Sequence, residues 1–160
     1  MICFDTSPII WGVQGRAHPT QEHMVDRTKR YIKYLAERKE QIMIPAPAMT
    51  EYLMRFKVEE QERQRQIIQR NFIVPAFDVR ASVLAAELLG NTELVQKIIA
   101  SGDLDKIKVK TDAQIIATAI VNQADKIISH DPDFAKLAQG RISVEEVPVI
   151  HMQMDIGFEK

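Results

Sequence analysis

The chain has 160 residues, about one domain at roughly 150 residues per domain, and its 46% of hydrophobic residues is enough for one core. Its 21 basic and 22 acidic residues give a net charge of −1, which excludes a broad basic surface that would hold duplex DNA by charge alone. The single cysteine, Cys3, excludes an intrachain disulfide. Because Asp5 interrupts the apolar start and no run approaches the ~18 apolar residues of a membrane helix, we expect a cytoplasmic protein with no membrane partner.

Short apolar runs alternate with amphipathic stretches along the chain, which is the pattern of a parallel sheet flanked by helices. The expected elements, in chain order, are a strand at 2–4, helices at 9–13 and 20–40, a strand at 42–44, helices at 46–56 and 58–70, a strand at 72–74, helices at 78–89 and 111–124, a strand at 126–129, a helix at 132–138 and a strand at 142–149. We therefore predict an α/β fold, a three-layer α/β/α sandwich with a central parallel sheet of about five strands. It forms one domain over residues 1–160, with an insertion at about 92–110 that holds one short helix.

Four carboxylates stand where the working groups of such a sheet collect, at or just after the carboxyl ends of strands. Asp5 follows the first strand, and Asp131 follows the fourth together with Ser129 and His130. Asp112 follows Thr111 at the expected start of the most apolar helix, and Glu51 lies in the helix after the second strand. We expect the four acids to converge at one edge of the sheet.

Each acid also has a structural interpretation. Asp5, Asp112 and Asp131 are all suited to a helix N-terminus, where a carboxylate caps free amides and gains from the helix dipole. Pro132 at the first helical position strengthens that interpretation for Asp131, and Asp133 shares it. Periodicity places Glu51 off the apolar face of its helix and so in solvent.

The four acids taken together are more informative about function than any one of them alone. Carboxylates packed in a cleft of low dielectric repel one another, and their pKa values rise, unless a cation compensates. Oxygen ligands without cysteine or a pair of histidines suit Mg²⁺ or Mn²⁺ better than Zn²⁺. Such a cation lowers the pKa of a bound water and screens phosphate charge, which suits phosphodiester hydrolysis.

The four acids lie in four short motifs, and the order of these motifs along the chain is informative. Asp5 begins the segment DTS, Glu51 lies in AMTEYL, residues 112–119 read DAQIIATA, and residues 129–134 read SHDPDF. Together they cover nearly the whole chain, and the chain resembles the PIN domain, a nuclease family that includes VapC-type toxins. The segment at 112–119 is the most specific match, and the insertion at 92–110 is longer than in compact members.

The resemblance implies a metal-dependent endoribonuclease acting on single-stranded or structured RNA, with Asp5, Glu51, Asp112 and Asp131 holding one or two Mg²⁺ or Mn²⁺ ions. It implies that water hydrolyses the phosphodiester and leaves a 5′-phosphate. It also implies that the protein forms a homodimer and, for toxin members, that it binds an antitoxin. We expect the carboxylates to be oriented by neighbouring polar side chains, namely Thr6, Ser7, Thr111, Ser129 and Asp133. Candidate RNA contacts are Arg16, His18, Lys108, Lys110 and His130, although a solvated charged face explains each of them singly.

Charge supports a role for a metal. Without the four acids the chain has 21 basic and 18 acidic residues, a net charge of +3, so a bound cation would change the sign at the cleft. Two alternatives stay open. A catalytically inactive PIN-like module that binds RNA or protein predicts no metal affinity, and a phosphohydrolase that phosphorylates Asp5 would have a second acid where this chain has Ser7.

Overall fold

The computed structural model describes residues 1–102 and 105–151. Within these residues the centre of the fold is a sheet of four parallel strands in the order β2-β1-β3-β4. The inner strand β1 (Ile2–Phe4) is buried along its whole length, as its unbroken apolar run predicts. The strands are β1 (Ile2–Phe4), β2 (Ile42–Met43), β3 (Lys126–Ile128) and β4 (Ser143–Glu145).

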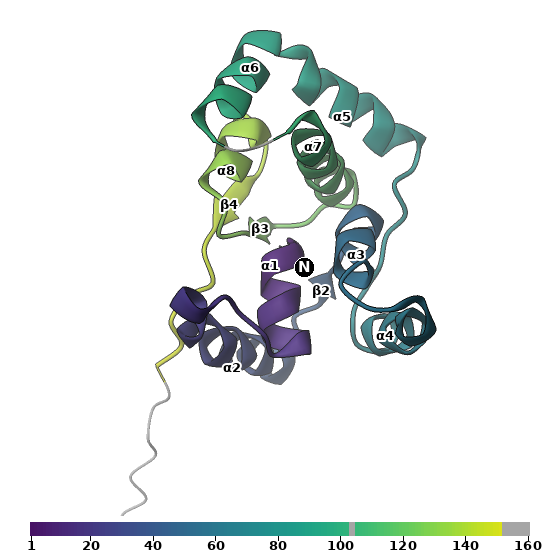
Figure 1. Cartoon of the computed structure of the whole chain (residues 1–160), viewed down its shortest axis with the longest axis vertical. Helices are drawn as coiled ribbons and strands as arrows, with labels where there is room; N and C mark the ends of the chain where they lie inside the picture. Colours follow the sequence, from purple (N-terminus) through teal and green to yellow (C-terminus); the bar gives the residue numbers. More distant parts are fainter. Residues whose placement is uncertain (103–104, 152–160) are drawn as a thin grey trace, which may run out of the picture.

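Helices cover both faces of this sheet and make up most of the chain (Figure 1). The helix α2 lies on one side of the strands and α7 on the other, so the predicted three-layer α/β/α sandwich is confirmed. The helices are α1 (Thr6–Ile9), α2 (His23–Glu37), α3 (Ala46–Leu53), α4 (Val58–Asn71), α5 (Val79–Gly90), α6 (Thr92–Ser101), α7 (Lys106–Val121) and α8 (Pro132–Ala138), with a π-helix η1 (Ile10–Gln14) and a 3₁₀ helix η2 (Pro19–Gln21).

The prediction of about five strands was slightly too high. The segment at 72–74 contributes a single parallel bridge, between Ile73 and Met43, beyond the edge of β2. Pro75 follows and has no amide to donate, and its carbonyl accepts from Ala46 at the start of α3. The last strand is also shorter than predicted, since it ends at Glu145, which pairs with Ile128 at the end of its partner strand β3.

The helix α7 starts earlier than the sequence suggested. The Asp105 carboxylate caps it by accepting from the amide of Lys108 at 2.8 Å, so the helix begins at Lys106 and not at Thr111. The predicted insertion at 92–110 therefore consists of α6, a connection and the first turn of α7. Residues 103–104 of this insertion, and residues 152–160 of the predicted domain, lie outside the described residues.

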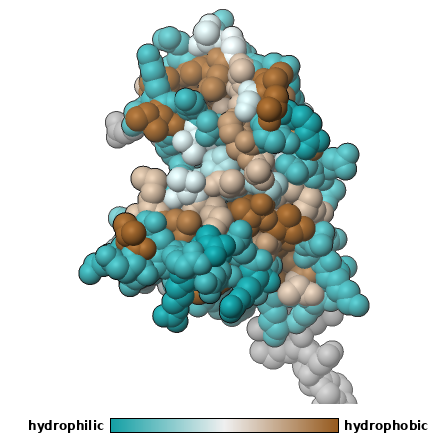
Figure 2. Space-filling view, turned by 90° about the vertical axis from the view of Figure 1, so that its right-hand side faces the viewer, coloured by the Kyte–Doolittle hydropathy of each residue, from teal (hydrophilic) through white to brown (hydrophobic). Residues whose placement is uncertain are grey.

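Around its axis α7 is buried on almost every side, because α3, α5, α6, α8 and β3 all contact it. The segment from Ala113 to Ala119 supplies most of this buried surface, whereas the lysines in the first five residues make α7 as a whole less apolar than α5. Among the described residues, no helix is long and apolar enough to cross a membrane. Figure 2 shows a surface on which hydrophobic residues alternate with hydrophilic ones.

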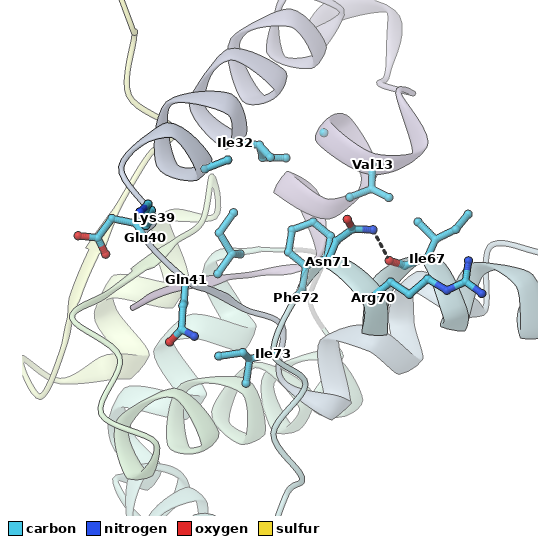
Figure 3. A pocket seen from close by; sticks show the side chains of 13 residues that line it. Val13, Ile32, Lys39, Glu40, Gln41, Ile67, Arg70, Asn71, Phe72 and Ile73 are labelled. Atoms are coloured by element: carbon cyan, nitrogen blue, oxygen red, sulfur yellow. Dashed lines mark hydrogen bonds between the residues drawn. The ribbon is translucent and has the colours of Figure 1, made fainter.

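A hollow of about 600 Å³ lies against the edge of the sheet between α2, β2 and α4 (Figure 3). Its walls are mainly apolar and include Ile32, Ile42 and Phe72. Gln41, at the amino end of β2, also lines it, whereas Asp5 and Asp131 follow the carboxyl ends of β1 and β3. None of the predicted site residues lines this hollow, so it is not where the predicted chemistry would take place.

Candidate active site

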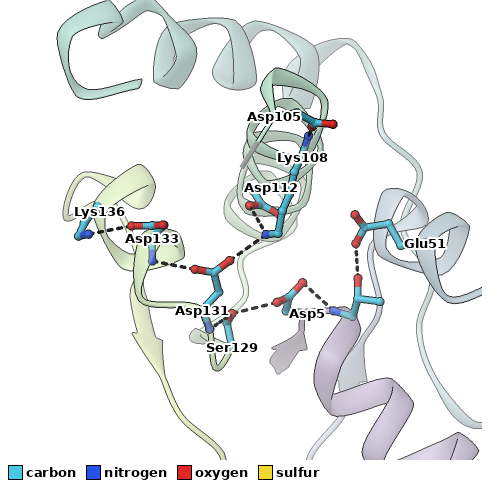
Figure 4. A network of polar contacts seen from close by, with 10 residues as sticks. Asp5, Glu51, Asp105, Lys108, Asp112, Ser129, Asp131, Asp133 and Lys136 are labelled. Carbon is cyan, nitrogen blue, oxygen red and sulfur yellow. Dashed lines mark hydrogen bonds and ion pairs between the residues drawn. The ribbon is translucent and has the colours of Figure 1, made fainter. Parts of the chain in front are cut away.

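The carboxylate of Asp5 stands at the carboxyl end of β1 and caps α1. Its Oδ1 accepts from the Thr6 amide at 2.6 Å, and its Oδ2 accepts from the Ser129 hydroxyl at 2.9 Å (Figure 4). Burial raises the pKa of Asp5 to about 6, because the two hydrogen bonds only partly offset the cost of desolvating the charge. The nearby charge of Glu51 raises this pKa further, and that of Lys108 lowers it.

Asp112 approaches the same place from α7. Because the helix begins at Lys106, Asp112 lies in its second turn and does not cap it, which removes the structural interpretation that the sequence allowed. The residue is only 4% exposed, and burial is the main reason that its pKa is raised to about 7. The ion pair with Lys108 lowers this pKa, and the nearby charges of Asp5 and Asp131 raise it.

Asp131 follows β3 and caps α8, as its position before a proline predicts. Its Oδ1 accepts from the amide of Asp133 at 2.9 Å, and its own amide donates to the Ser129 hydroxyl at 3.2 Å. Partial burial would raise its pKa, but the ion pair with Lys108 and the Asp133 amide hold that pKa below its ordinary value.

Glu51 comes from α3 and completes the acidic group. Its Oε2 accepts a hydrogen bond from the Thr6 hydroxyl, which fixes the carboxylate toward the end of β1 (Figure 4). The residue is half-buried, so the solvent position that helical periodicity predicted was wrong. Periodicity identifies only the face that packs on the core, and it does not register a polar side chain held at the edge of that face.

Lys108 is the member of this group whose role the sequence did not suggest. Its Nζ donates to Asp112 Oδ2 at 2.9 Å and to Asp131 Oδ2 at 2.8 Å, and thus joins α7 to the start of α8. These ion pairs raise the pKa of Lys108 in spite of its partial burial. The spacing of four residues between Lys108 and Asp112 on one helix was the signal that could have revealed the first pair.

The residues expected to orient the carboxylates divide into two groups. Thr6 and Ser129 donate to site carboxylates, as described above, and the Asp133 amide does the same for Asp131. The Thr111 hydroxyl donates instead to the carbonyl of Ile107 one turn earlier. Ser7 is half-buried and lines a separate small hollow beside Trp11.

The expected RNA contacts are also spread over different surroundings. Arg16 and His18 are exposed and line the same hollow as Ser7, and Lys110 is exposed on α7. The His130 ring packs edge-on against Trp11, with 5.5 Å between ring centroids, and its Nδ1 lies 3.8 Å from a Glu146 carboxylate oxygen. Only Lys108 of this set contacts the acidic group directly.

Comparison with known proteins identifies the family of this chain. The sequence profile of the PIN domain family matches residues 2–140. The chain belongs to the PIN domain family. This PIN domain is also similar in fold to a chain in the crystal structure of VapBC2 from Rickettsia felis bound to a DNA fragment from their promoter, with a TM-score of 0.62 and 18% identity over 91% of this chain and 98% of that one. No curated protein matches its sequence.

The donors of this PIN domain fit a hard divalent cation by their chemistry, since Asp5, Glu51, Asp112 and Asp131 offer only carboxylate oxygens. In the part of the chain that the structure describes, however, no three acidic, histidine or cysteine side chains are grouped closely enough to form a ready metal site. The ammonium of Lys108 stands between two of the four acids and sets their separation. In this arrangement Lys108 is the cation in contact with Asp112 and Asp131.

Proposed function

We propose that this PIN domain is a Mg²⁺- or Mn²⁺-dependent endoribonuclease that hydrolyses single-stranded or structured RNA. The observation that supports the proposal is the meeting of Asp5, Glu51, Asp112 and Asp131, from four separate elements, at the carboxyl edge of the sheet. Membership of a family whose domains are generally nucleases points the same way.

Each side chain has a distinct task in this proposal. The four carboxylates hold the cation, which when bound lowers the pKa of a water and screens the charge of the phosphodiester. Ser129 orients Asp5, and Thr6 orients Glu51, so the oxygens keep their directions when a cation enters. Burial of Asp5 and Asp112 keeps bulk water from screening the site, which strengthens its electrostatics.

The proposed partners extend this function. A chain of a VapBC2 structure shares the fold, which supports the proposal that this protein is the toxin of a toxin–antitoxin pair and binds an antitoxin. We further propose a homodimer in the cytoplasm and an RNA substrate. The exposed residues Arg16, Lys110 and His18, together with the half-buried His130, are the candidate RNA contacts.

The test is cleavage of an end-labelled single-stranded RNA in the presence of Mn²⁺, with and without EDTA. Asp5→Asn and Asp112→Asn are expected to lose more activity than the roughly 10–100-fold that removing an orienting partner costs at a metal site. Asp26→Asn is the matched control, because Asp26 is exposed on α2 and pairs with Arg30. Cleavage that survives EDTA or both site substitutions would overturn the proposal.

Calorimetric titration with Mn²⁺ separates the nuclease from an inactive binding module. The nuclease binds Mn²⁺ and loses this binding in Asp112→Asn. A module that binds RNA or protein without catalysis shows neither metal affinity nor cleavage, and that result would favour it.

A further inference from the structure

The Lys108 side chain is placed as a cation within the acidic group. Its ammonium bridges Asp112 and Asp131, at 2.9 and 2.8 Å, and it donates to no backbone carbonyl of the described residues. The two acids belong to different elements, α7 and the cap of α8, so the ammonium connects two parts of the fold (Figure 4). The same two acids are among the four carboxylates that would hold a divalent cation.

An ammonium and a divalent cation compete for the same carboxylates. Asp112 Oδ2 and Asp131 Oδ2 accept from Lys108, while Asp131 Oδ1 accepts from the Asp133 amide. Each of these oxygens keeps a further lone pair, but a divalent cation that used it would stand beside the positive charge of the ammonium. Binding of a cation to both acids is therefore favoured when the ammonium moves away.

The surroundings of Lys108 leave it room to move. Its side chain is 39% exposed, whereas that of Asp112 is 5% exposed, so the lysine borders on solvent and the aspartate does not. Lys108 lines an open hollow of about 530 Å³ between α3 and α7, whose walls include Met54 and Ile107, both 74% exposed. A lysine stem can lie along such an apolar wall with its charged end in water.

We propose that Lys108 is an exchangeable counter-ion of the acidic group, which neutralises Asp112 and Asp131 until a divalent cation displaces it. The inference rests on the proposed function, since it concerns how that site takes up its metal. Lys108 lowers the affinity for the cation and in return prevents repulsion between the acids. It is thus a residue that sets the metal concentration at which the enzyme loads.

Calorimetric titration of the whole protein with Mn²⁺, without RNA, tests this directly. Lys108→Met keeps most of the side-chain stem but removes the charge, and we expect it to bind Mn²⁺ at least tenfold more tightly than the wild type. Lys106→Met is the matched control, because Lys106 is exposed on the same helix and its substitution removes the same charge. We expect the control to change the affinity by less than twofold.

The outcomes distinguish this inference from the proposed function. Equal or weaker Mn²⁺ binding by Lys108→Met, with wild-type binding intact, would show that Lys108 is a fixed structural partner and would leave the nuclease proposal standing. Absence of Mn²⁺ binding in both proteins would overturn the two together.

A second measurement uses the unmodified chain, in case Lys108→Met does not fold. Nuclear magnetic resonance signals of the lysine Cε and Nζ atoms are followed during titration with Mg²⁺, and Lys108 is assigned by the loss of its signal in Lys108→Arg. We expect the signal to move to the position of the exposed lysines as Mg²⁺ binds. A Lys108 signal that stays in place while the metal binds would overturn the inference.

Discussion

Ser129 and Asp5 lie 124 positions apart, and the Ser129 hydroxyl donates a 2.9 Å hydrogen bond to Asp5 Oδ2. The contact exists because β1 and β3 are neighbouring parallel strands, whose carboxyl ends meet at one edge of the sheet. The same hydroxyl oxygen accepts from the Asp131 amide at 3.2 Å. Ser129 therefore connects two of the four acids through one atom.

Replacing Ser129 by alanine leaves a buried oxygen of Asp5 without this donor. We expect Ser129→Ala to lower the free energy of unfolding at pH 8 by about 1–3 kcal/mol, the range for an unsatisfied buried group, and to raise the pKa of Asp5 further. Urea denaturation measures the first effect. Ser143→Ala on exposed β4 is the control and is expected to change stability by less than about 0.5 kcal/mol. Equal effects of the two substitutions would contradict the assigned contact.

Two threonines that look equivalent in the sequence are distinguished by the structure. The Thr6 hydroxyl orients Glu51, whereas the Thr111 hydroxyl donates to a backbone carbonyl of its own helix. We expect Thr6→Val to weaken Mn²⁺ binding by ~10–100-fold, and Thr111→Val to change it by less than about twofold. Calorimetry on both variants checks this, and similar losses would show that the Thr6–Glu51 contact does not orient the carboxylate.

Gly12 provides a test of the packing between η1 and α2. In η1 it contacts α2 so closely that an added Cβ would lie 2.4 Å from Ile32 Cδ1 and 2.9 Å from Thr28 Cγ2. We expect Gly12→Ala to destabilise the protein by about 1–3 kcal/mol, because the Ile32 side chain can move but the buried Thr28 cannot. Gly90→Ala meets no atom within 4 Å and is expected to be neutral. Thermal unfolding of both variants measures the two effects. An unchanged stability of Gly12→Ala would show that α2 moves to make room for the added methyl group.

Local signals predicted some elements to the residue. Helix α8 spans Pro132–Ala138 as expected, because a capping aspartate, a proline at the first helical position and Gly140 fix both ends. The predicted start of α7 at Thr111 is too late, because Asp105 is the residue that caps the helix. The strand expected at 72–74 failed for a different reason, since an edge strand depends on pairing that a short apolar run cannot reveal.

The same contrast holds at the candidate site. Asp5 and Asp131 follow buried strands, so the topology of a parallel sheet predicts that they come close. The position of the Glu51 carboxylate depends on a hydrogen bond from Thr6, 45 residues earlier in the chain. The helical pattern around Glu51 does not predict that contact. The bridge from Lys108 to Asp131 spans 23 residues and likewise arises only in the folded chain.

Asp5 and Asp112 couple folding to pH. Their pKa values are raised from 3.8 to about 6 and about 7, so between pH ~4 and ~7 the folded chain binds more protons than the unfolded chain. Their contribution to stability is therefore complete below the unfolded pKa and is lost as the pH rises through 6 and 7. A metal reverses this preference, since it binds the deprotonated carboxylates, and Mn²⁺ affinity is expected to rise over the same interval.

Asp112→Asn isolates this effect, because the amide stays neutral at every pH. Relative to its value at pH 4.5, the stability difference between variant and wild type is expected to shift in favour of the variant by up to roughly 3 kcal/mol at pH 8, which corresponds to the raised pKa of Asp112. Urea denaturation in EDTA at pH 4.5, 6 and 8 measures it, and comparing differences cancels the titration of exposed groups such as Asp78 and Asp125. A difference that does not vary with pH would mean that Asp112 is ionised throughout, held by Lys108, and that metal binding needs no loss of its proton.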